Sequence, residues 1–468
     1  MSLDLNGKTI TDPLYGNIHL SEIEAKIVSS RCFQRLHNVR QLGLGHLVFP
    51  SAGYSRFAHS VGACFNAERI LSAIEANSDR KFKDEERQAF RLAALLHDLG
   101  HFPFSHTTEH AIKRFYRHEI FKTEEAAQHE LAISGPLQPP ARYLDHEDTG
   151  KLIFLEDAEI EKAFASVDSV SKDDVTAAFI DEKLSTIISS DLDCDRLDYL
   201  RRTSLHSGAP YGAVDVDFII SKSTVDVDGR FCFDRKATRA ADHLLVSRFY
   251  DFMQIPYQKT VAALEWSLEE SVLWLLKDGR VNLSEQGLKD LLARDKWASF
   301  DDGELTAMMR AARIDCGDPV YGDHIAAVLD RNPAKLVYSW EVLADLKSDE
   351  QAAREELLEY KIREVADRFG IDKRRFNIWK APFKLSKAGP ILQGSPTDRD
   401  YSEEEAQQLI HILRKDQSHS SPLIDMNSTV AHHLSALRYR VLRIYYLPSV
   451  NDGPNMKKQL REAFEAQN

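Results

Sequence analysis

The chain has 468 residues, of which 43% are hydrophobic and 28% are charged, as is ordinary for a soluble globular protein. This composition excludes disordered, collagen-like and low-complexity chains for most of the length. Acidic residues number 73 and basic residues 60. The formal net charge of −13 argues against a protein that coats nucleic acid without specificity. It is compatible with a local basic cleft.

Cysteine usage and hydropathy indicate the compartment. The five cysteines are widely spaced and form no Cys-x-x-Cys pair, which argues against a disulfide scaffold and favours a reducing compartment. The first residues lack the apolar stretch of a signal peptide, and no apolar run reaches the ~18 residues of a transmembrane helix. We therefore expect a cytoplasmic protein without a membrane partner.

Helical periodicity prevails in the first part of the chain. The clearest predicted helix is Asp84–Leu99, where apolar residues recur at steps of three and four. Asp84 is expected to cap its N-terminus, and Gly100 is expected to end it in the left-handed conformation. A second helix is predicted over Asp181–Arg202, and the Pro and Gly residues of 135–140 predict a loop.

Strand patterns appear in the later part. Ser223–Asp234 alternates around an Asp-Gly pair, which is typical of a short β-hairpin. Alternation returns at Lys335–Trp340 and Arg440–Leu447. Between these two segments, Glu355–Phe369 has the pattern of an amphipathic helix that ends at Gly370.

These patterns together predict a mainly α protein with two regions. Residues 1–285 are expected to form a large helical domain, and residues 286–468 are expected to form a smaller mixed α+β region. The sequence shows no internal repeat.

Histidines gather at the end of the helix predicted to end at Leu99. The segment 97–106 contains three histidines and one aspartate, namely His97, Asp98, His101 and His106. A His-Asp dipeptide alone arises by chance, and histidines at a helix end can simply meet the negative end of the helix dipole. However, His97 and Asp98 end an apolar helix, where an unpaired charge is costly unless it binds a partner.

Two further polar groups lie among apolar residues. One is His59, and the other is a set of four aspartates on the second predicted helix, Asp191, Asp193, Asp195 and Asp198. Imidazoles and carboxylates together suit Mn, Fe, Co, Ni, Zn or Mg and leave coordination positions for water and phosphate oxygens. The residues alone leave three interpretations open: a divalent metal site, satisfied core histidines, or a solvated Asp-rich helix face.

Several motifs follow one another in order over about the first 260 residues. They are His59, His97-Asp98 and Asp195, accompanied by Asp12–Gly16, Phe33–Leu36, Gln41–Gly45, Val48–Ser60, Leu95–His106, Asp195–Tyr199 and Gly208–Gly212. This arrangement resembles the HD-domain metal-dependent phosphohydrolases, and most closely their deoxynucleoside triphosphate triphosphohydrolases. The resemblance implies a helical HD core, to which the patterns above add a smaller α+β C-terminal portion. The resemblance is weak after this part of the chain.

The resemblance also implies roles for individual residues. It assigns a divalent metal to His59, His97, Asp98 and Asp195. It makes His106 the general acid, with Glu109 orienting it, and it gives His101 and His129 contacts to the phosphates. The competing interpretations are a surface histidine for His106 and a solvated helix for His129.

Four more positions match residues that bind the substrate in the family. Arg56 and Arg196 correspond to arginines that clamp the phosphate chain, and Gln41 and Tyr199 correspond to residues that contact the sugar. The alternatives are an ion pair with a neighbouring carboxylate for each arginine, a turn residue for Gln41 and an apolar filler for Tyr199.

The chain also departs from the family pattern. Thr203 follows Arg202 where the family has an aspartate that contacts the sugar 3′-hydroxyl, and Met253–Gln258 lacks the family's cations. Arg248 and Lys259 are candidates to replace those cations. The sequence therefore predicts the reaction class more firmly than it predicts the sugar or base.

A basic and aromatic patch lies in the C-terminal part. Residues 373–380 combine Lys and Arg with Phe and Trp, and Lys384 and Lys387 follow. Such a patch can bind single-stranded nucleic acid or a regulatory nucleotide, but more often it is a solvated face with buried aromatics.

The expected activity is metal-dependent hydrolysis of (deoxy)nucleoside triphosphates to nucleoside and triphosphate. The alternatives are an HD-type phosphodiesterase or nuclease that acts on single-stranded nucleic acid, and a nucleotide-sensing protein without turnover. By resemblance, the expected partners are a nucleotide substrate, a regulatory nucleotide and further copies of the chain in a dimer or tetramer.

Overall fold

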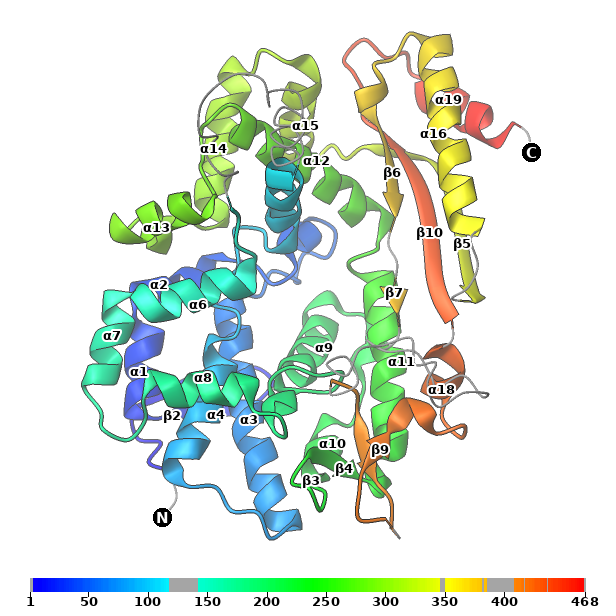
Figure 1. Ribbon diagram of the computed structural model, residues 1–468. Helices are drawn as coiled ribbons and strands as arrows, with labels where there is room; N and C mark the ends of the chain where they lie inside the picture. Colours follow the sequence, from blue (N-terminus) through cyan, green and yellow to red (C-terminus); the bar gives the residue numbers. More distant parts are fainter. Residues whose placement is uncertain are drawn as a thin grey trace, which may run out of the picture.

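A computed structural model describes the protein over residues 3–117, 142–345, 350–380, 383–384, 408–415, 417–435 and 437–466. Helices dominate these residues and the sheets are small, so the predicted mainly α class is confirmed (Figure 1). Among the described helices, none combines the length and the apolar composition needed to cross a lipid bilayer.

The elements of the first half are mostly helices. They are β1 (Lys8–Asp12), β2 (Gly16–Leu20), α1 (Glu22–Ser29), α2 (Arg31–Gln34), α3 (Arg56–Asn77), α4 (Asp84–Leu96), the helical segment 106–117, α6 (His146–Glu156), α7 (Ala158–Ala165), α8 (Lys172–Ile180), α9 (Cys194–Ser207) and α10 (Val216–Ser221). They are followed by β3 (Ser223–Val225), β4 (Phe231–Asp234), α11 (Thr238–Gln254), α12 (Lys259–Lys277), α13 (Glu285–Ala293), α14 (Asp302–Asp315) and α15 (Pro319–Leu329).

Strands and helices alternate in the rest of the chain. The elements are β5 (Lys335–Asp345), α16 (Glu350–Phe369), β6 (Phe376–Lys380), β7 (Phe383–Lys384), β8 (His411–Leu413), β9 (Ser421–Pro422), α18 (Val430–Ser435), β10 (Leu437–Tyr446) and α19 (Met456–Glu465). Strand β10 lies between β5 and β6 and is antiparallel to both. The predicted strands at 335–340 and 440–447, the helix that ends at Gly370 and the hairpin of β3 with β4 are all confirmed.

The C-terminal sheet has a core of its own. Leu358 and Ile362 of α16 and Leu460 of α19 pack with Val337 and Leu442 of the sheet. Figure 1 shows these two helices beside the sheet, with the helical part of the chain on its other side. The main core includes residues beyond 285, such as those of α14 and β8, and the division near residue 285 stays a prediction.

Helix α3 is the central support of the site. The side chain of Ser55 caps it by accepting a hydrogen bond from the backbone N–H of Ala58 at 3.4 Å. Helix α9 approaches α3 closely at Gly62, where a Cβ atom would lie 2.0 Å from Asp198 Oδ1. Glycine at this position therefore allows His59, on the preceding turn of α3, to meet the polar face of α9.

Two predictions about helix ends were wrong. Gly100 does not adopt a positive φ angle, and the helix predicted to reach Leu99 ends at Leu96 with Lys83 as its N-cap.

The helix predicted over Asp181–Arg202 is broken. The carboxylate of Asp181 accepts hydrogen bonds from two following backbone N–H groups, and Asp193 caps a new helix, because aspartate side chains compete for backbone donors.

The basic and aromatic patch is largely neutralised by ion pairs. Arg374 lies 2.7 Å from Asp318 and from Asp372, Arg375 lies 2.7 Å from Asp323, and Lys380 pairs with Glu355. Phe376 is buried in the C-terminal core. Residue Lys387 and the loop predicted over 135–140 lie outside the described residues.

A buried histidine predicts acid sensitivity of the fold. His324 is 1% exposed, and its ring packs edge-on against Trp266 with 4.7 Å between centroids. Burial lowers the pKa of His324 to about 3, below the ~6.5 of a free histidine. This residue's contribution to stability is full above pH 6.5. It is lost as the pH falls toward 3, because only the unfolded chain takes up the proton.

We therefore expect His324 to lower the free energy of unfolding by about 2 kcal/mol between pH 7 and pH 5. In urea unfolding at these two pH values, His324→Gln should show a pH dependence smaller by about that amount. The exposed His243 on α11 gives a matched control, His243→Gln. Equal pH dependence in the two variants would contradict the prediction.

Candidate metal centre and active site

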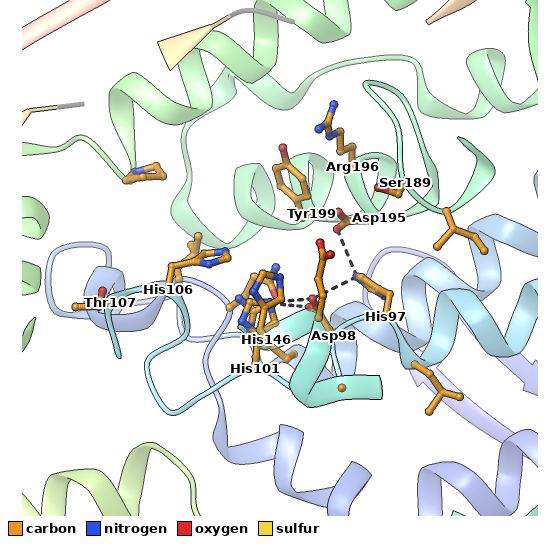
Figure 2. Close-up of a pocket in the computed structure, with 18 of the residues that line it drawn as sticks. His97, Asp98, His101, His106, Thr107, His146, Ser189, Asp195, Arg196 and Tyr199 are labelled. Carbon is orange, nitrogen blue, oxygen red and sulfur yellow. Dashed lines mark hydrogen bonds and ion pairs between the residues drawn. The ribbon is translucent and has the colours of Figure 1, made fainter. Parts of the chain in front are cut away.

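A cavity of about 1210 Å³ collects most of the predicted site residues. Its lining includes nine of them: Gln41, Arg56, His97, Asp98, His101, His106, Asp195, Arg196 and Tyr199. His59 and Glu109 are 0% and 3% exposed and lie behind this wall. His129 lies outside the described residues. Figure 2 shows His101 and His146 beside Asp98, with His106 farther to the left and His97 and Asp195 to the right. His101 Nε2 lies 3.1 Å from Asp98 Oδ1.

The four predicted metal ligands converge although they come from distant segments. His59 Nε2 lies 2.9 Å from Asp195 Oδ1, 3.3 Å from His97 Nε2 and 3.6 Å from Asp98 Oδ2. His97 Nε2 lies 3.5 Å from Asp98 Oδ1 and 3.8 Å from Asp195 Oδ1. Donor atoms about 2.1 Å from a common cation lie roughly 3 Å apart at right angles, so these spacings fit one divalent ion.

The hydrogen bonds of the two imidazoles leave their Nε2 atoms for a metal. His97 Nδ1 lies 2.8 Å from the carbonyl oxygen of Ala94, and His59 Nδ1 lies 2.8 Å from Asp198 Oδ2. Both contacts use Nδ1 as the donor, so each Nε2 can coordinate a cation once its ring is neutral. The two Nε2 atoms lie 3.3 Å apart. The residues therefore fit a divalent metal, with Asp198 and Ala94 as its outer supports.

A chain of ion pairs continues from this support. Arg202 donates to both oxygens of Asp198 at 2.9 and 2.8 Å, and its Nη1 lies 2.8 Å from Asp12 Oδ2 on the N-terminal hairpin. All three side chains are buried. Burial lowers the pKa of His59, but its hydrogen bonds with Asp195 and Asp198 outweigh burial and raise it to about 10. The donor set therefore attracts positive charge strongly.

Glu109 organises a second cluster next to the predicted metal ligands. Its Oε2 lies 2.7 Å from His146 Nδ1 and 3.5 Å from His106 Nδ1, and its Oε1 accepts from Lys113 at 2.5 Å. The ring of His101 stacks on that of His146 with 4.2 Å between centroids. Burial raises the pKa of Glu109, but the hydrogen bonds from His106, His146 and Lys113 hold it well below its usual range, so the carboxylate is ionised.

The sequence analysis missed His146. It follows Asp145, the N-cap of α6. The only feature of the local sequence that points to a close contact is Gly150, one turn later. A Cβ atom on Gly100 would lie 2.1 Å from the backbone nitrogen of Gly150 and 2.1 Å from the carbonyl oxygen of His146. Gly100 therefore serves close helix packing rather than a left-handed turn, and this contact brings His146 to the site.

The substitution Gly100→Ala should disturb this contact. The added methyl group would meet backbone atoms that cannot turn aside, so we expect a loss of about 2–4 kcal/mol in the free energy of unfolding. Urea unfolding measures this loss. A Cβ atom added to Gly317 would meet no other atom within 4 Å, and Gly317→Ala should change stability by less than about 1 kcal/mol. Comparable losses in both variants would count against the packing role.

The arginines of the site are already paired. Arg56 Nη1 lies 2.5 Å from Asp98 Oδ2 and its Nε donates to Ser105 Oγ at 2.9 Å, while Arg196 Nη1 lies 2.7 Å from Asp191 Oδ1. These are the ion pairs that the sequence analysis gave as the alternative. Both arginines nevertheless line the cavity, and phosphate binding by them stays a prediction.

The predicted sugar contacts face the same cavity. Tyr199 lies one turn after Asp195 on α9, and the Oε1 atom of Gln41 is buried without a hydrogen-bond partner in the described part of the chain. At the position that departs from the family, Thr203 Oγ1 lies 2.7 Å from Tyr54 Oη. Arg248 lines the cavity, whereas Lys259 is not among the lining residues.

Comparison with known proteins agrees with this geometry. Residues 56–200 match the model of the HD domain. An uncharacterized protein from Methanocaldococcus jannaschii is 30% identical over 307 residues, which cover 65% of this chain and 55% of that protein. The chain spans about half the length of its relatives: 55% of the Methanocaldococcus jannaschii protein and 53% of an uncharacterized protein from Bacillus subtilis.

Two further similarities concern named phosphohydrolases. The bovine deoxynucleoside triphosphate triphosphohydrolase SAMHD1 is 32% identical over 155 residues, which are 32% of this chain and 26% of that protein. The crystal structure of a phosphohydrolase from Bacteroides thetaiotaomicron has a TM-score of 0.65 at 20% identity, and the match covers 94% of this chain and all of that one. This likeness shows the shared fold. Residues 56–200 are therefore similar to HD domains, and part of the chain is similar to a deoxynucleoside triphosphate triphosphohydrolase.

Proposed function

We propose that the protein is a metal-dependent phosphohydrolase that converts (deoxy)nucleoside triphosphates into nucleoside and triphosphate. One observation carries the proposal: a four-donor metal centre and a cluster of histidines held by Glu109 adjoin in one cavity, where His101 Nε2 lies 3.1 Å from Asp98 Oδ1. The name of the bovine relative, a deoxynucleoside triphosphate triphosphohydrolase, supports the choice of substrate.

The metal ligands and the histidine cluster have different roles in the proposed reaction. A divalent cation held by His59, His97, Asp98 and Asp195 would supply a Lewis acid that activates water and neutralises phosphate charge. Next to these ligands, ionised Glu109 holds the imidazole of His106, which is exposed to the cavity. His106 then donates a proton to the departing ester oxygen. His101 and His146 lie beside His106 and add hydrogen-bond donors for phosphate oxygens.

A second candidate function is a phosphodiesterase or nuclease that uses the same centre. One observation favours it, because the cavity extends to Asn377, Trp379 and Lys380 of the basic and aromatic patch. An aromatic ring and polar groups there are suited to stacked bases of single-stranded nucleic acid. The pairing of Lys380 with Glu355 weakens this candidate.

A cleavage panel tests the proposal. The purified protein is incubated with Mn²⁺, Mg²⁺, Co²⁺ or Ni²⁺ and with each dNTP, each NTP or single-stranded DNA, singly and in mixtures. Ion-exchange chromatography should resolve nucleoside and intact triphosphate. Shortened DNA with untouched nucleotides would favour the second candidate, and binding without any product would favour a nucleotide sensor.

The same panel addresses regulation. Activity that occurs only in nucleotide mixtures would identify a regulatory nucleotide. Light scattering with and without nucleotides measures whether the chain forms the dimer or tetramer that the resemblance implies. Both features stay predictions.

A further inference from the structure

Asp251 is a buried carboxylate that lines the cavity and has no role in the chemistry described above. It lies near the end of α11 and is 3% exposed. Ionised carboxylates are rarely buried in proteins unless they are paired or bind a ligand. The surroundings of Asp251 therefore indicate what it binds.

The carboxylate is held by one donor and leaves one oxygen unused. The hydroxyl of Tyr211 donates to Asp251 Oδ1. Within the described parts of the chain, Oδ2 has no hydrogen-bond donor and Asp251 forms no ion pair. Burial raises the pKa of Asp251 to about 7, although the hydrogen bond from Tyr211 and the positive charge of nearby Arg248 oppose this rise. An acceptor without a donor on a cavity wall is suited to a ligand that brings one.

The neighbours of Asp251 place it beside the metal centre. Burial raises the pKa of Tyr54 and Tyr199, and the nearby Asp251 carboxylate adds to both rises. Tyr199 is one turn of α9 from Asp195, and the backbone N–H of Gln41 donates to the carbonyl oxygen of Tyr54 at 3.2 Å. Asp251 therefore belongs to a polar wall formed with Gln41, Tyr54 and Tyr199, next to the metal ligands.

The dimensions of a nucleotide indicate that its sugar would lie at this wall when its α-phosphorus is at the metal centre. In a nucleoside 5′-triphosphate only O5′ and C5′ separate the α-phosphorus from the sugar ring. A substrate with its α-phosphorus at the metal centre therefore brings its sugar to the adjoining wall. The donors on a ribose or deoxyribose are hydroxyl groups. Among side chains, a carboxylate is the strongest hydrogen-bond acceptor for such a neutral donor.

We infer that Asp251 accepts a hydrogen bond from a sugar hydroxyl of the substrate, the 3′-hydroxyl in a deoxynucleotide, and thereby selects substrates that carry it. The inference rests on the proposed function. Tyr211 positions the carboxylate, and Oδ2 contacts the ligand.

The test compares nucleotides with and without the hydroxyl. We expect the unaltered protein to cleave a 2′-deoxynucleoside triphosphate with a kcat/KM about 10- to 100-fold above that of its 2′,3′-dideoxy analogue. In Asp251→Asn, which keeps the shape and can still accept from Tyr211, this ratio should fall to within about threefold through a loss on the natural substrate. A ratio that stays above tenfold in the variant would overturn the inference.

Two controls separate recognition from folding. Asp242 is another buried carboxylate of α11, but it accepts from the backbone N–H groups of Val430 and Ala431. Asp242→Asn should leave the ratio unchanged even if it lowers the Tm. Ribonucleotides and 3′-deoxynucleotides complete the panel. If Asp251→Asn changes only the response to the 2′-hydroxyl, the assignment of the 3′-hydroxyl to Asp251 is overturned.

Failure of the proposed function has a distinct signature. If the unaltered protein cleaves no nucleoside triphosphate, calorimetry measures the binding of dATP and 2′,3′-dideoxy-ATP. A preference for dATP that Asp251→Asn removes supports the inference in a protein without turnover. Equal binding of the two nucleotides, or no binding, overturns it.

Discussion

Replacing Asp195 with alanine is expected to lower kcat by at least about 10³-fold, because it removes one of four donors from the metal centre. Asp195 Oδ1 lies 2.9 Å from His59 Nε2, so the loss leaves the two imidazoles and Asp98 with an incomplete set. The side chain of Asp195 is 30% exposed, in contrast to the buried His59, and the fold should survive the change. Hydrolysis rates and the bound metal, measured by mass spectrometry, should fall together.

A matched control is Asp148→Ala, which removes an exposed carboxylate from the first turn of α6. This variant should keep its metal and its activity, and both variants should have a Tm within a few degrees of the unaltered protein. If Asp195→Ala retained full activity with a bound metal, the centre would have to be assigned to other residues.

The substitution His106→Asn is expected to lower kcat by about 10²- to 10⁴-fold on a nucleoside triphosphate, because the leaving oxygen then receives no proton. A leaving group that needs no proton should rescue the variant. With a nucleoside triphosphate in which sulfur replaces the bridging O5′, the departing thiolate needs no proton, and the loss should shrink to less than about tenfold. Comparison of the two substrates therefore distinguishes a proton donor from a residue that only shapes the cavity.

The neighbouring histidines provide the controls for this experiment. His110 lies one helical turn after His106 and also lines the cavity, and His110→Asn should affect both substrates little and equally. His146 shares Glu109 with His106 at the shorter distance, 2.7 Å against 3.5 Å. If His146→Asn gave the rescue pattern and His106→Asn did not, the proton donor would be His146.

The fold class and the convergence of His59, His97, Asp98 and Asp195 could be predicted from the sequence. The signal was an ordered set of motifs, and motif order is kept even where distant segments meet only in three dimensions. The broken helix after Asp181 could not be predicted from apolar spacing. Its residues keep helical periodicity, while aspartate side chains capture the backbone N–H groups that a continuous helix would need.

The histidine cluster shows the same limit at the site. His146 joins it through a contact between two glycines on different segments, and a single sequence does not reveal which glycines meet. The pairing of Arg56 with Asp98 is also tertiary, because the two residues lie on α3 and after α4. Residue types and spacing therefore predicted the kinds of groups in the cavity, but not their partners.

The chain of ion pairs from His59 through Asp198 and Arg202 to Asp12 gives the N-terminal hairpin a part in the chemistry. Asp12 lies far from the cavity in sequence, yet it neutralises the arginine that holds the carboxylate on His59. Without Asp12, Arg202 would draw more electron density from Asp198, and the imidazole would become a weaker electron donor to the metal. Through Asp12, the hairpin of β1 and β2 would thus tune the Lewis acidity of a metal held at this centre.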